Sequence, residues 1–424
     1  MTEELVHHIW QFGLFEQNNL KTIQNEKIEI KKAGTYNTDA GPDFFNAKIK
    51  IGDTLWAGNV EIHINASDWD KHKHQNNLAY NNIILHVVYN ADQKILRNTN
   101  TEIPTLELKN IIDQRIITNY QKIKSNKDWI PCEKEIKKTP SIIIDNIIDK
   151  LLIERIESKT KQIEENLILN KFNWEETFYQ HMAKNFGFKT NAIPFELLAK
   201  SIPSTIFAKH KNSLPQIEAL LFGQAGFLND HFNDTYLLQL QNEYLFLKQK
   251  YKLQPIEKHL WKFLRLRPSN FPTIRIAQFA DLIFNSVHLF SKTIEASNEI
   301  YLSELLKVKA SNYWQNHYVF EKETKTKEKL LGAESINNII INTIVPFVFM
   351  YGKHKNDDNY TQKSVSYLQN IKAEKNTIIK NWKDIGLKIN TAYEAQAFIQ
   401  LKNEYCSQKK CLKCSIGNYL LKNL

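Results

Sequence analysis

The pattern of apolar and polar residues divides the chain into two parts. In the first part, apolar residues alternate with polar ones at the two-residue period of β-strands. The strands predicted in this way span residues 27–31, 46–51, 55–64, 82–89 and 104–108, and a helix over residues 4–15 precedes them. Residues 82–89 are nearly all apolar, which predicts a strand covered on both faces. The first part is therefore expected to form a small mixed sheet.

The second part has the apolar spacing of helices. It follows a polar junction that contains Pro131 and Pro140, and helix starts are indicated at Asn173, Pro215 and Thr391 and at Phe271-Pro272. We expect an α+β or α/β N-terminal domain with a small mixed sheet, then a larger all-α domain ending in a Cys-rich metal-binding tail. The predicted boundaries are 1–125, a linker at 126–140, a helical domain at 141–400 and a Cys-rich segment at 401–424.

No stretch of the sequence predicts a membrane span. The most apolar stretch, residues 336–350, is short and contains Pro346, so it is expected to be a buried helix. The residues after Met1 lack the apolar run of a secretion signal. We therefore expect a soluble cytoplasmic protein with no membrane partner. The sequence does not indicate its oligomeric state.

The excess of positive over negative charge lies entirely in the second part. Residues 1–130 hold 15 Lys/Arg and 16 Asp/Glu, which leaves 41 and 30 of the totals of 56 and 46 for residues 131–424. This second part therefore has a net charge of +11 (41 − 30). Such a charge favours a polyanionic partner, nucleic acid first. The alternative is a lysine-rich surface that keeps the protein in solution.

A predicted hairpin carries the residues with the clearest chemistry. If Gly52-Asp53 forms its turn, facing residue numbers sum to about 105 to 107, and Asp43 lies opposite residues 62–64. Glu61 and His63 are two residues apart, so they project from one face. Carboxylates that converge in this way are ligands for Mg²⁺ or Mn²⁺.

Four histidines follow within a short stretch: His63, His72, His74 and His86. If the loop that carries His72 and His74 folds back over the sheet, both side chains can ligate a metal ion. Three histidines and one carboxylate would favour Zn²⁺, Fe²⁺ or Mn²⁺ over Mg²⁺. The alternative is that His86 is a core histidine bonded to backbone, with the other two on a solvated loop. Trp69 is expected to pack under that loop.

The cysteines predict a second metal centre. Cys406, Cys411 and Cys414 form a C-x4-C-x2-C pattern, and Cys132 lies far upstream. Thiols at this spacing can converge on one ion, and Cys132 would complete four ligands for a Zn²⁺ site or an iron–sulfur cluster. The alternative is that the three C-terminal cysteines are ordinary cytosolic thiols.

Three arginines predict a phosphate contact in the helical part. Arg265, Arg267 and Arg275 flank a segment in which Pro272 can begin a helix. Guanidinium groups together with free N–H groups can hold a phosphate. The alternative is a structural arginine network between packed helices.

The hairpin motif resembles the PD-(D/E)xK nuclease superfamily, with Pro42-Asp43 and Glu61-Ile62-His63 in place of its dyad and its Glu-x-Lys. The resemblance implies that Asp43 and Glu61 bind the metal and that His63 orients or deprotonates the attacking water. Histidine replaces the usual lysine and is positively charged only when protonated. Some nucleases of that superfamily carry an iron–sulfur cluster held by one cysteine and a C-terminal trio.

Over its whole length the chain resembles an uncharacterised bacterial family known as a domain of unknown function. The segments that carry this resemblance are residues 37–44, 58–63, 68–74 and 264–278 and the Cys-rich tail.

Three functions follow as hypotheses. The first is a metal-dependent nuclease-like enzyme acting on DNA or RNA. The second is a non-catalytic nucleic-acid or protein adaptor with a structural cysteine centre. The third is a His-rich metallohydrolase acting on a small substrate.

Overall fold

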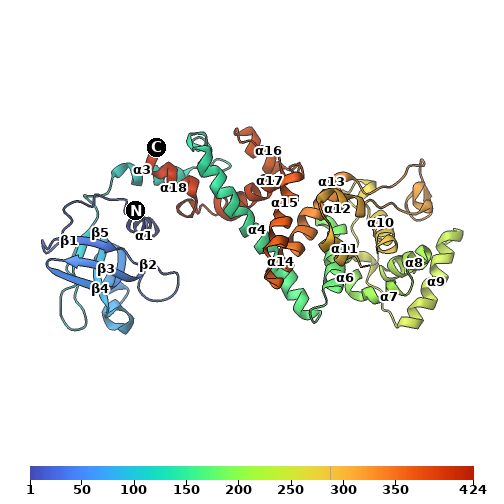
Figure 1. Ribbon diagram of the computed structural model, residues 1–424, viewed down its shortest axis with the longest axis horizontal. Coiled ribbons are helices and arrows are strands. Elements are labelled where there is room, and N and C mark those ends of the chain that lie inside the picture. The colour runs from blue at the N-terminus through green and yellow to red at the C-terminus, as the bar shows by residue number, and fades with distance from the viewer. Residues whose placement is uncertain (287) are drawn as a thin grey trace. The chain divides into compact units, whose positions relative to one another are not determined.

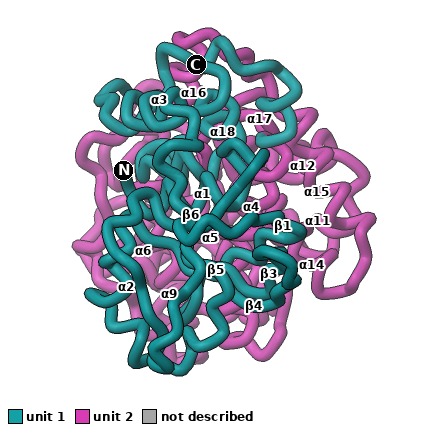
Figure 2. Tube along the Cα trace, turned by 90° about the vertical axis from the view of Figure 1, so that its left-hand side faces the viewer, with its two compact units in different colours: residues 1–147, 402–424 teal, residues 148–401 magenta. Residues whose placement is uncertain are grey.

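The computed structural model describes residues 1–286 and 288–424 in two compact units. Unit 1 comprises residues 1–147 and 402–424, and unit 2 comprises residues 148–401 (Figure 2). The segment 126–140, predicted as a linker, and nearly all of the predicted Cys-rich segment belong to unit 1. The two ends of the chain are thus part of the same unit.

Unit 1 contains the predicted mixed sheet (Figure 1). Its strands follow the order β1-β3-β4-β5-β6, with the short β2 paired to β3. The pairs β1–β3 and β3–β4 are antiparallel, whereas β4–β5 and β5–β6 are parallel. The elements are α1 (Glu3–Gln11), β1 (Ile28–Lys32), β2 (Thr35–Tyr36), β3 (Phe44–Ile51), β4 (Thr54–Asn65), α2 (Asp68–Lys71), β5 (Ile83–Asn90), β6 (Thr105–Glu107) and α3 (Gln114–Ser125).

Apolar burial explains why the sheet forms. Residues 83–88 of β5 are all buried, as expected for a central strand covered on both faces. Helix α1 packs against β4 and buries Leu5, Val6, Ile9 and Trp10. The sheet and this helix therefore form the scaffold on which the polar side chains of β4 are held.

The β3–β4 hairpin turns at the predicted position, with Ile51 paired to Thr54. Its register shifts at a bulge beside Asn46, whose φ is +57° and whose N–H donates to the Asn59 Oδ1 atom over 3.3 Å. Beyond the bulge Phe44 pairs with Val60. The expected position of Asp43 opposite residues 62–64 was therefore wrong, because the bulge moves it back opposite Glu61.

The C-terminal segment packs on helix α3 through α18 (Ser415–Asn423). The Asn119 amide donates to the carbonyl of Leu421 over 3.1 Å, and the Lys409 amine donates to the carbonyl of Lys124 over 2.7 Å. Lys402 donates to the carbonyl of Trp129 over 2.9 Å. These bonds fix residues 402–424 against residues 119–129.

Unit 2 is largely helical. Helix α4 (Ser141–Leu169) begins in unit 1, and several predicted helix starts are confirmed: the side chains of Asn173, Ser213 and Thr391 cap α5, α8 and α17. The expectation of an all-α region was wrong in one place, where β7 (His317–Val319) and β8 (Lys322–Glu323) form a small hairpin. The helices of unit 2 are α5 (Trp174–Phe186), α6 (Phe188–Ser201), α7 (Ser204–Ala208), α8 (Leu214–Gln224), α9 (Thr235–Tyr251), α10 (Pro272–Asn285), α11 (Leu289–Glu295), α12 (Glu299–Leu305), α13 (Ala333–Ile339), α14 (Val345–Lys355), α15 (Asp358–Asn370), α16 (Thr377–Asp384) and α17 (Ala392–Gln400).

The most apolar stretch of the sequence forms one helical run, Ala333–Lys355, which passes through a π-helical turn at Ile340–Ile344. Pro346 is accommodated in the first turn of α14, so the proline does not end the run and the stretch is longer than expected. By length and composition alone the run is long enough to cross a membrane. About two thirds (67%) of its most apolar 18-residue stretch is buried within the protein, as in a core helix.

Candidate metal site

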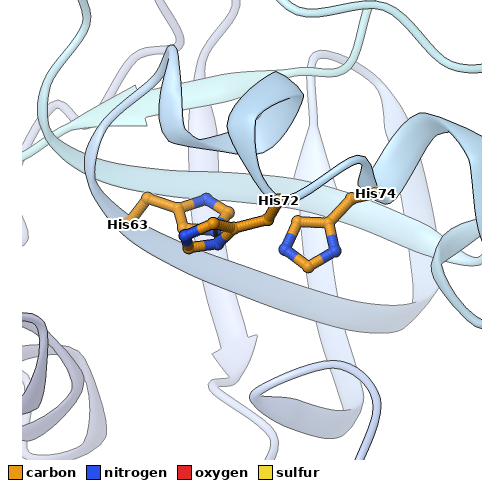
Figure 3. A group of neighbouring side chains, drawn as sticks. All are labelled: His63, His72 and His74. Atoms are coloured by element: carbon orange, nitrogen blue, oxygen red, sulfur yellow. Dashed lines mark hydrogen bonds between the residues drawn. The ribbon is translucent and has the colours of Figure 1, made fainter.

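Three histidines gather beside β4 of unit 1 (Figure 3). One ring nitrogen from each of His63, His72 and His74 lies within 4.8 Å of the other two. His63 is on β4, His72 follows α2, and His74 begins a short 3₁₀ turn. Lys73, between the last two, has a φ of +60°. This left-handed residue turns the chain so that the loop folds back over the sheet.

Glu61 adds a carboxylate to the three imidazoles. Its Oε1 atom lies 3.4 Å from His74 Nε2 and 3.8 Å from His63 Nε2. Glu61 is 4% exposed and His63 is 1% exposed, whereas His72 is exposed. The group is therefore buried on the side of β4 and open on the side of His72.

The orientation of His63 is fixed by His86 on β5. His63 Nδ1 lies 2.8 Å from His86 Nε2, so His63 Nε2 is directed toward His72 Nδ1, 3.1 Å away. His86 is fully buried, as expected for a core histidine, but its partner is His63 and not backbone. A second residue that holds the other nitrogen of an imidazole is the usual support of a metal-ligating histidine.

Asp43 lies next to this group. Its Oδ2 atom accepts from the N–H of Ile62 over 2.9 Å, and its own N–H donates to Glu61 Oε2 over 3.2 Å. His7 of α1 places its Nε2 atom 3.2 Å from Asp43 Oδ2. The sequence did not identify His7, because only the packing of α1 on β4 brings this histidine to the hairpin.

Burial sets the protonation of the site. It lowers the pKa of His63 to about 2, with a further effect of the neighbouring histidines, and lowers the pKa of His74 to about 4. Burial and the adjacent Asp43 raise the pKa of Glu61 to about 9. The two imidazoles are therefore neutral at pH 7, which is the form that ligates metals. Glu61 is protonated unless a cation is nearby.

Two aromatic side chains pack under the loop. Trp69 is 1% exposed and makes edge contacts with His74 and His86. The Tyr80 ring centroid lies 3.9 Å from that of His74. Burial, with the nearby Glu61, raises the pKa of Tyr80 to about 12, so its hydroxyl stays protonated at neutral pH. Trp69 thus packs as expected, while Tyr80 was not identified from the sequence.

The remaining predicted site residues lie elsewhere. Cys132, Cys406, Cys411 and Cys414 all belong to unit 1, and none of them is in a disulfide with another described residue. Among the described residues, they do not form a close group of the kind that the three histidines form. In unit 2, Arg275 is buried in α10, whereas Arg265 and Arg267 are exposed.

The fold and the site define a two-unit protein whose N-terminal mixed sheet carries a group of imidazole and carboxyl side chains. The chain belongs to the family described as "Protein of unknown function (DUF2851)", which matches residues 3–377. The match includes Glu61, the three histidines and Cys132, and it ends before the three C-terminal cysteines. No curated protein and no solved structure matches the chain.

Proposed function

We propose that unit 1 is a metal-dependent phosphodiesterase of nuclease-like type that acts on DNA or RNA. The observation that carries the proposal is the convergence of Glu61 with His63, His72 and His74 beside β4. Three imidazoles and one carboxylate form a donor set for a divalent cation. The histidine-rich set favours Mn²⁺, Zn²⁺ or Fe²⁺, and Mn²⁺ also suits the carboxylates of Asp43 and Glu61.

The hairpin supports phosphodiester chemistry. Asp43 directly precedes β3 and lies opposite Glu61 on β4. His63 is two residues beyond Glu61 on the same strand. This arrangement resembles the Pro-Asp and Glu-x-Lys arrangement of PD-(D/E)xK nucleases. A bound divalent ion would lower the pKa of a water molecule and stabilise charge on the phosphate.

The protein's own residues have separable roles in this proposal. Glu61 supplies negative charge once its proton is displaced, and His86 keeps His63 in one orientation. Asp43 lies beside the donor set and against His7, where its carboxylate can accept a proton from water. The net charge of +11 on residues 131–424 would attract a nucleic-acid strand.

The test is cleavage of single-stranded and duplex DNA and RNA with Mn²⁺, Zn²⁺ or Mg²⁺. Wild type is compared with Glu61→Gln and with Glu29→Gln, a matched change at an exposed residue of β1. We expect Mn²⁺-dependent cleavage that Glu61→Gln reduces by at least about 100-fold. The Glu29→Gln variant should cleave like wild type. Equal cleavage by wild type and Glu61→Gln would contradict the proposal.

A second candidate is a metallohydrolase that acts on a small substrate, and the three-histidine group favours it. Tightly bound Zn²⁺ or Fe²⁺ in the purified protein, with hydrolysis of a small phosphate ester and no cleavage of nucleic acid, would select this candidate. Salt-dependent nucleic-acid binding that survives Glu61→Gln, without any hydrolysis, would select a non-catalytic adaptor.

We also propose that Cys132, Cys406, Cys411 and Cys414 hold a Zn²⁺ ion or an iron–sulfur cluster. Two lysine–backbone bonds support this proposal, because Lys402 and Lys409 fix the C-terminal segment against residues 124–129, close to Cys132 in the chain. Burial, with the neighbouring thiols, raises the pKa of Cys132 and Cys406. Neutral thiols cannot ligate until a cation displaces their protons.

Metal analysis of the full-length protein, purified without oxygen, tests the cysteine centre. One zinc per chain, or iron with visible absorption, is expected in wild type and should be lost in Cys411→Ser. Thr118→Ser, at an exposed residue of α3, serves as the conservative control. Metal content that is equal in Cys411→Ser and wild type would contradict this centre.

A further inference from the structure

A buried arginine in unit 2 has no acidic partner. Arg275 on α10 is 5% exposed. Its Nη1 atom donates to Gln278 Oε1 over 3.0 Å, and its Nη2 atom donates to Asn270 Oδ1 and Ser335 Oγ over 2.6 and 3.0 Å. All three acceptors are neutral, and its Nε atom is buried without a hydrogen-bond partner. Among the described residues, the guanidinium forms no ion pair, so its charge is not neutralised.

This arginine lines a cavity of about 190 Å³. The polar side chains around it include Thr190, Asn270, Ser335 and Asn338. Glu334 also borders the cavity, but it is exposed, and its carboxylate lies 3.2 Å from the amine of Lys375. The charged side chain buried in the wall is therefore positive, and hydroxyl and amide groups surround it.

The backbone next to the cavity is held in an unusual conformation. Phe188 has a φ of +47°, and its ring centroid lies 4.6 Å from the guanidinium carbon of Arg275. Gly187 approaches Asn191 so closely that a Cβ atom on the glycine would lie 2.2 Å from the Asn191 carbonyl oxygen. Asn191 also interrupts the helical geometry of α6. Strained residues that persist in a fold often belong to binding sites.

The free-energy cost of the uncompensated charge on Arg275 indicates which kind of ligand the cavity binds. A buried guanidinium without a counter-charge destabilises a fold, because the charge has lost its hydration. An oxyanion would offset this cost, and guanidinium groups match the oxygen geometry of phosphate. We propose that this cavity binds a phosphate group, held by Arg275 and by the hydroxyl and amide side chains around it. The proposal does not depend on the chemistry of unit 1.

A substitution that places a carboxylate in the cavity tests this site. In Ser335→Asp, the new carboxylate takes the position of a hydroxyl that already lies 3.0 Å from Arg275 Nη2. It should pair with the guanidinium and occupy the site. Thr235→Asp adds the same charge at an exposed residue in the first turn of α9, also in unit 2, and serves as the control. The Arg275→Lys variant keeps the charge and loses the planar fork.

The measurement is thermal unfolding of the full chain with inorganic phosphate against chloride, at matched ionic strength and with EDTA present. We expect phosphate to raise the Tm of wild type and Thr235→Asp in a saturable way. The Ser335→Asp variant should have a higher Tm without phosphate and no response to it. The Arg275→Lys variant should need at least about tenfold more phosphate for the same rise in Tm. No response in wild type, or an equal response in Ser335→Asp, would overturn the proposal.

The source of the phosphate is distinguished by competition. A short single-stranded DNA that shifts the phosphate response of wild type to higher concentrations would identify a nucleic-acid backbone as the ligand. An unchanged response would identify a free phosphate or a small phosphate ester. Either result supports the site if Ser335→Asp abolishes the response.

Discussion

At the scale of single residues, the pair formed by His63 and His86 determines which ring nitrogen faces the other histidines. If His63 binds a cation through Nε2, its Nδ1–H must donate to His86 Nε2. The Nδ1 atom of His86 is buried without a hydrogen-bond partner, so the fold accepts one unsatisfied polar atom to maintain this orientation. A purely structural histidine in this position would have no need of the second imidazole.

Substitution of His86 is therefore expected to weaken metal binding without removing a ligand. We expect His86→Phe to lower Mn²⁺ or Zn²⁺ affinity by about 10- to 100-fold. His86→Gln should recover part of it, because an amide oxygen can accept from His63. Competition with a chelating dye measures the affinity. His181→Gln, at a buried histidine of unit 2, is the control, and equal affinities in all four proteins would contradict this role.

A second residue-scale prediction concerns pH and Glu218, which is 1% exposed and accepts from the Tyr236 hydroxyl over 3.0 Å. Burial raises its pKa from 4.5 to about 7. Because folding raises this pKa, the contribution of Glu218 to the free energy of unfolding is fully present below pH 4.5. It is lost as the pH rises through about 7.

Glu218→Gln should remove that loss, because the amide stays neutral while its oxygen still accepts from Tyr236. The variant should therefore be more stable than wild type above pH 7, by up to about 3 kcal/mol. Urea unfolding at pH 5 and at pH 8.5 measures the difference. The same difference between the two proteins at both pH values would rule out Glu218 as its cause.

At the scale of elements, the β3–β4 hairpin places the site, and one glycine allows β4 to lie against its neighbour. A Cβ atom on Gly58 would lie 2.4 Å from the Ile84 side chain and 2.7 Å from the carbonyl oxygen of Asn82. The backbone at residue 82 cannot rotate away as a flexible side chain can. Glu61 and His63 follow on the same strand, so strain at Gly58 reaches the site.

Gly58→Ala is accordingly expected to destabilise unit 1 by about 1–3 kcal/mol. It should also weaken metal binding, because β4 must shift. Ala57→Ser, at the exposed neighbouring residue, should change neither property. Denaturant unfolding and metal titration of both variants provide the comparison, and a Gly58→Ala protein as stable as wild type would contradict the close approach.

The elements show how far the sequence could be interpreted. Alternation and apolar runs predicted the strands of the sheet except the short β2, and capping residues such as Asn173 and Thr391 marked helix starts, because these signals are local. The gathering of His63, His72 and His74 depended on the condition that their loop folds back, which the left-handed Lys73 meets. The bulge at Asn46 and the approach of His7 arise from tertiary packing, which no local pattern encodes.

At the scale of the whole molecule, unit 1 is made of two separate stretches of chain. Residues 402–424 cover α3. The amines of Lys402 and Lys409 donate to the carbonyls of Trp129 and Lys124, and the carbonyl of Leu421 accepts from the Asn119 amide. Removal of these residues takes away the buried Ile416 and Leu420 and exposes the face of α3 against which α18 packs. The integrity of unit 1 is thus expected to depend on the end of the chain.

A protein truncated after residue 401 should show this dependence. We expect protease cleavage within residues 114–147 to be at least about tenfold faster than in the full chain, because unpacked helices open more often. Cleavage within residues 148–401 should be unchanged. Limited proteolysis followed by mass spectrometry locates the cuts, and equal rates in residues 114–147 would show that the terminal segment does not support unit 1.

The discontinuity of unit 1 also has a consequence during translation. Ribosomes add about 5–20 residues per second, so residues 148–401 take roughly 13–50 s to synthesise. For most of that interval, the first stretch of unit 1 has left the ribosome while the stretch that covers α3 has not been made. The nascent chain therefore holds an uncovered apolar face until residues 402–424 are made, and chaperones have their longest access to it in this interval.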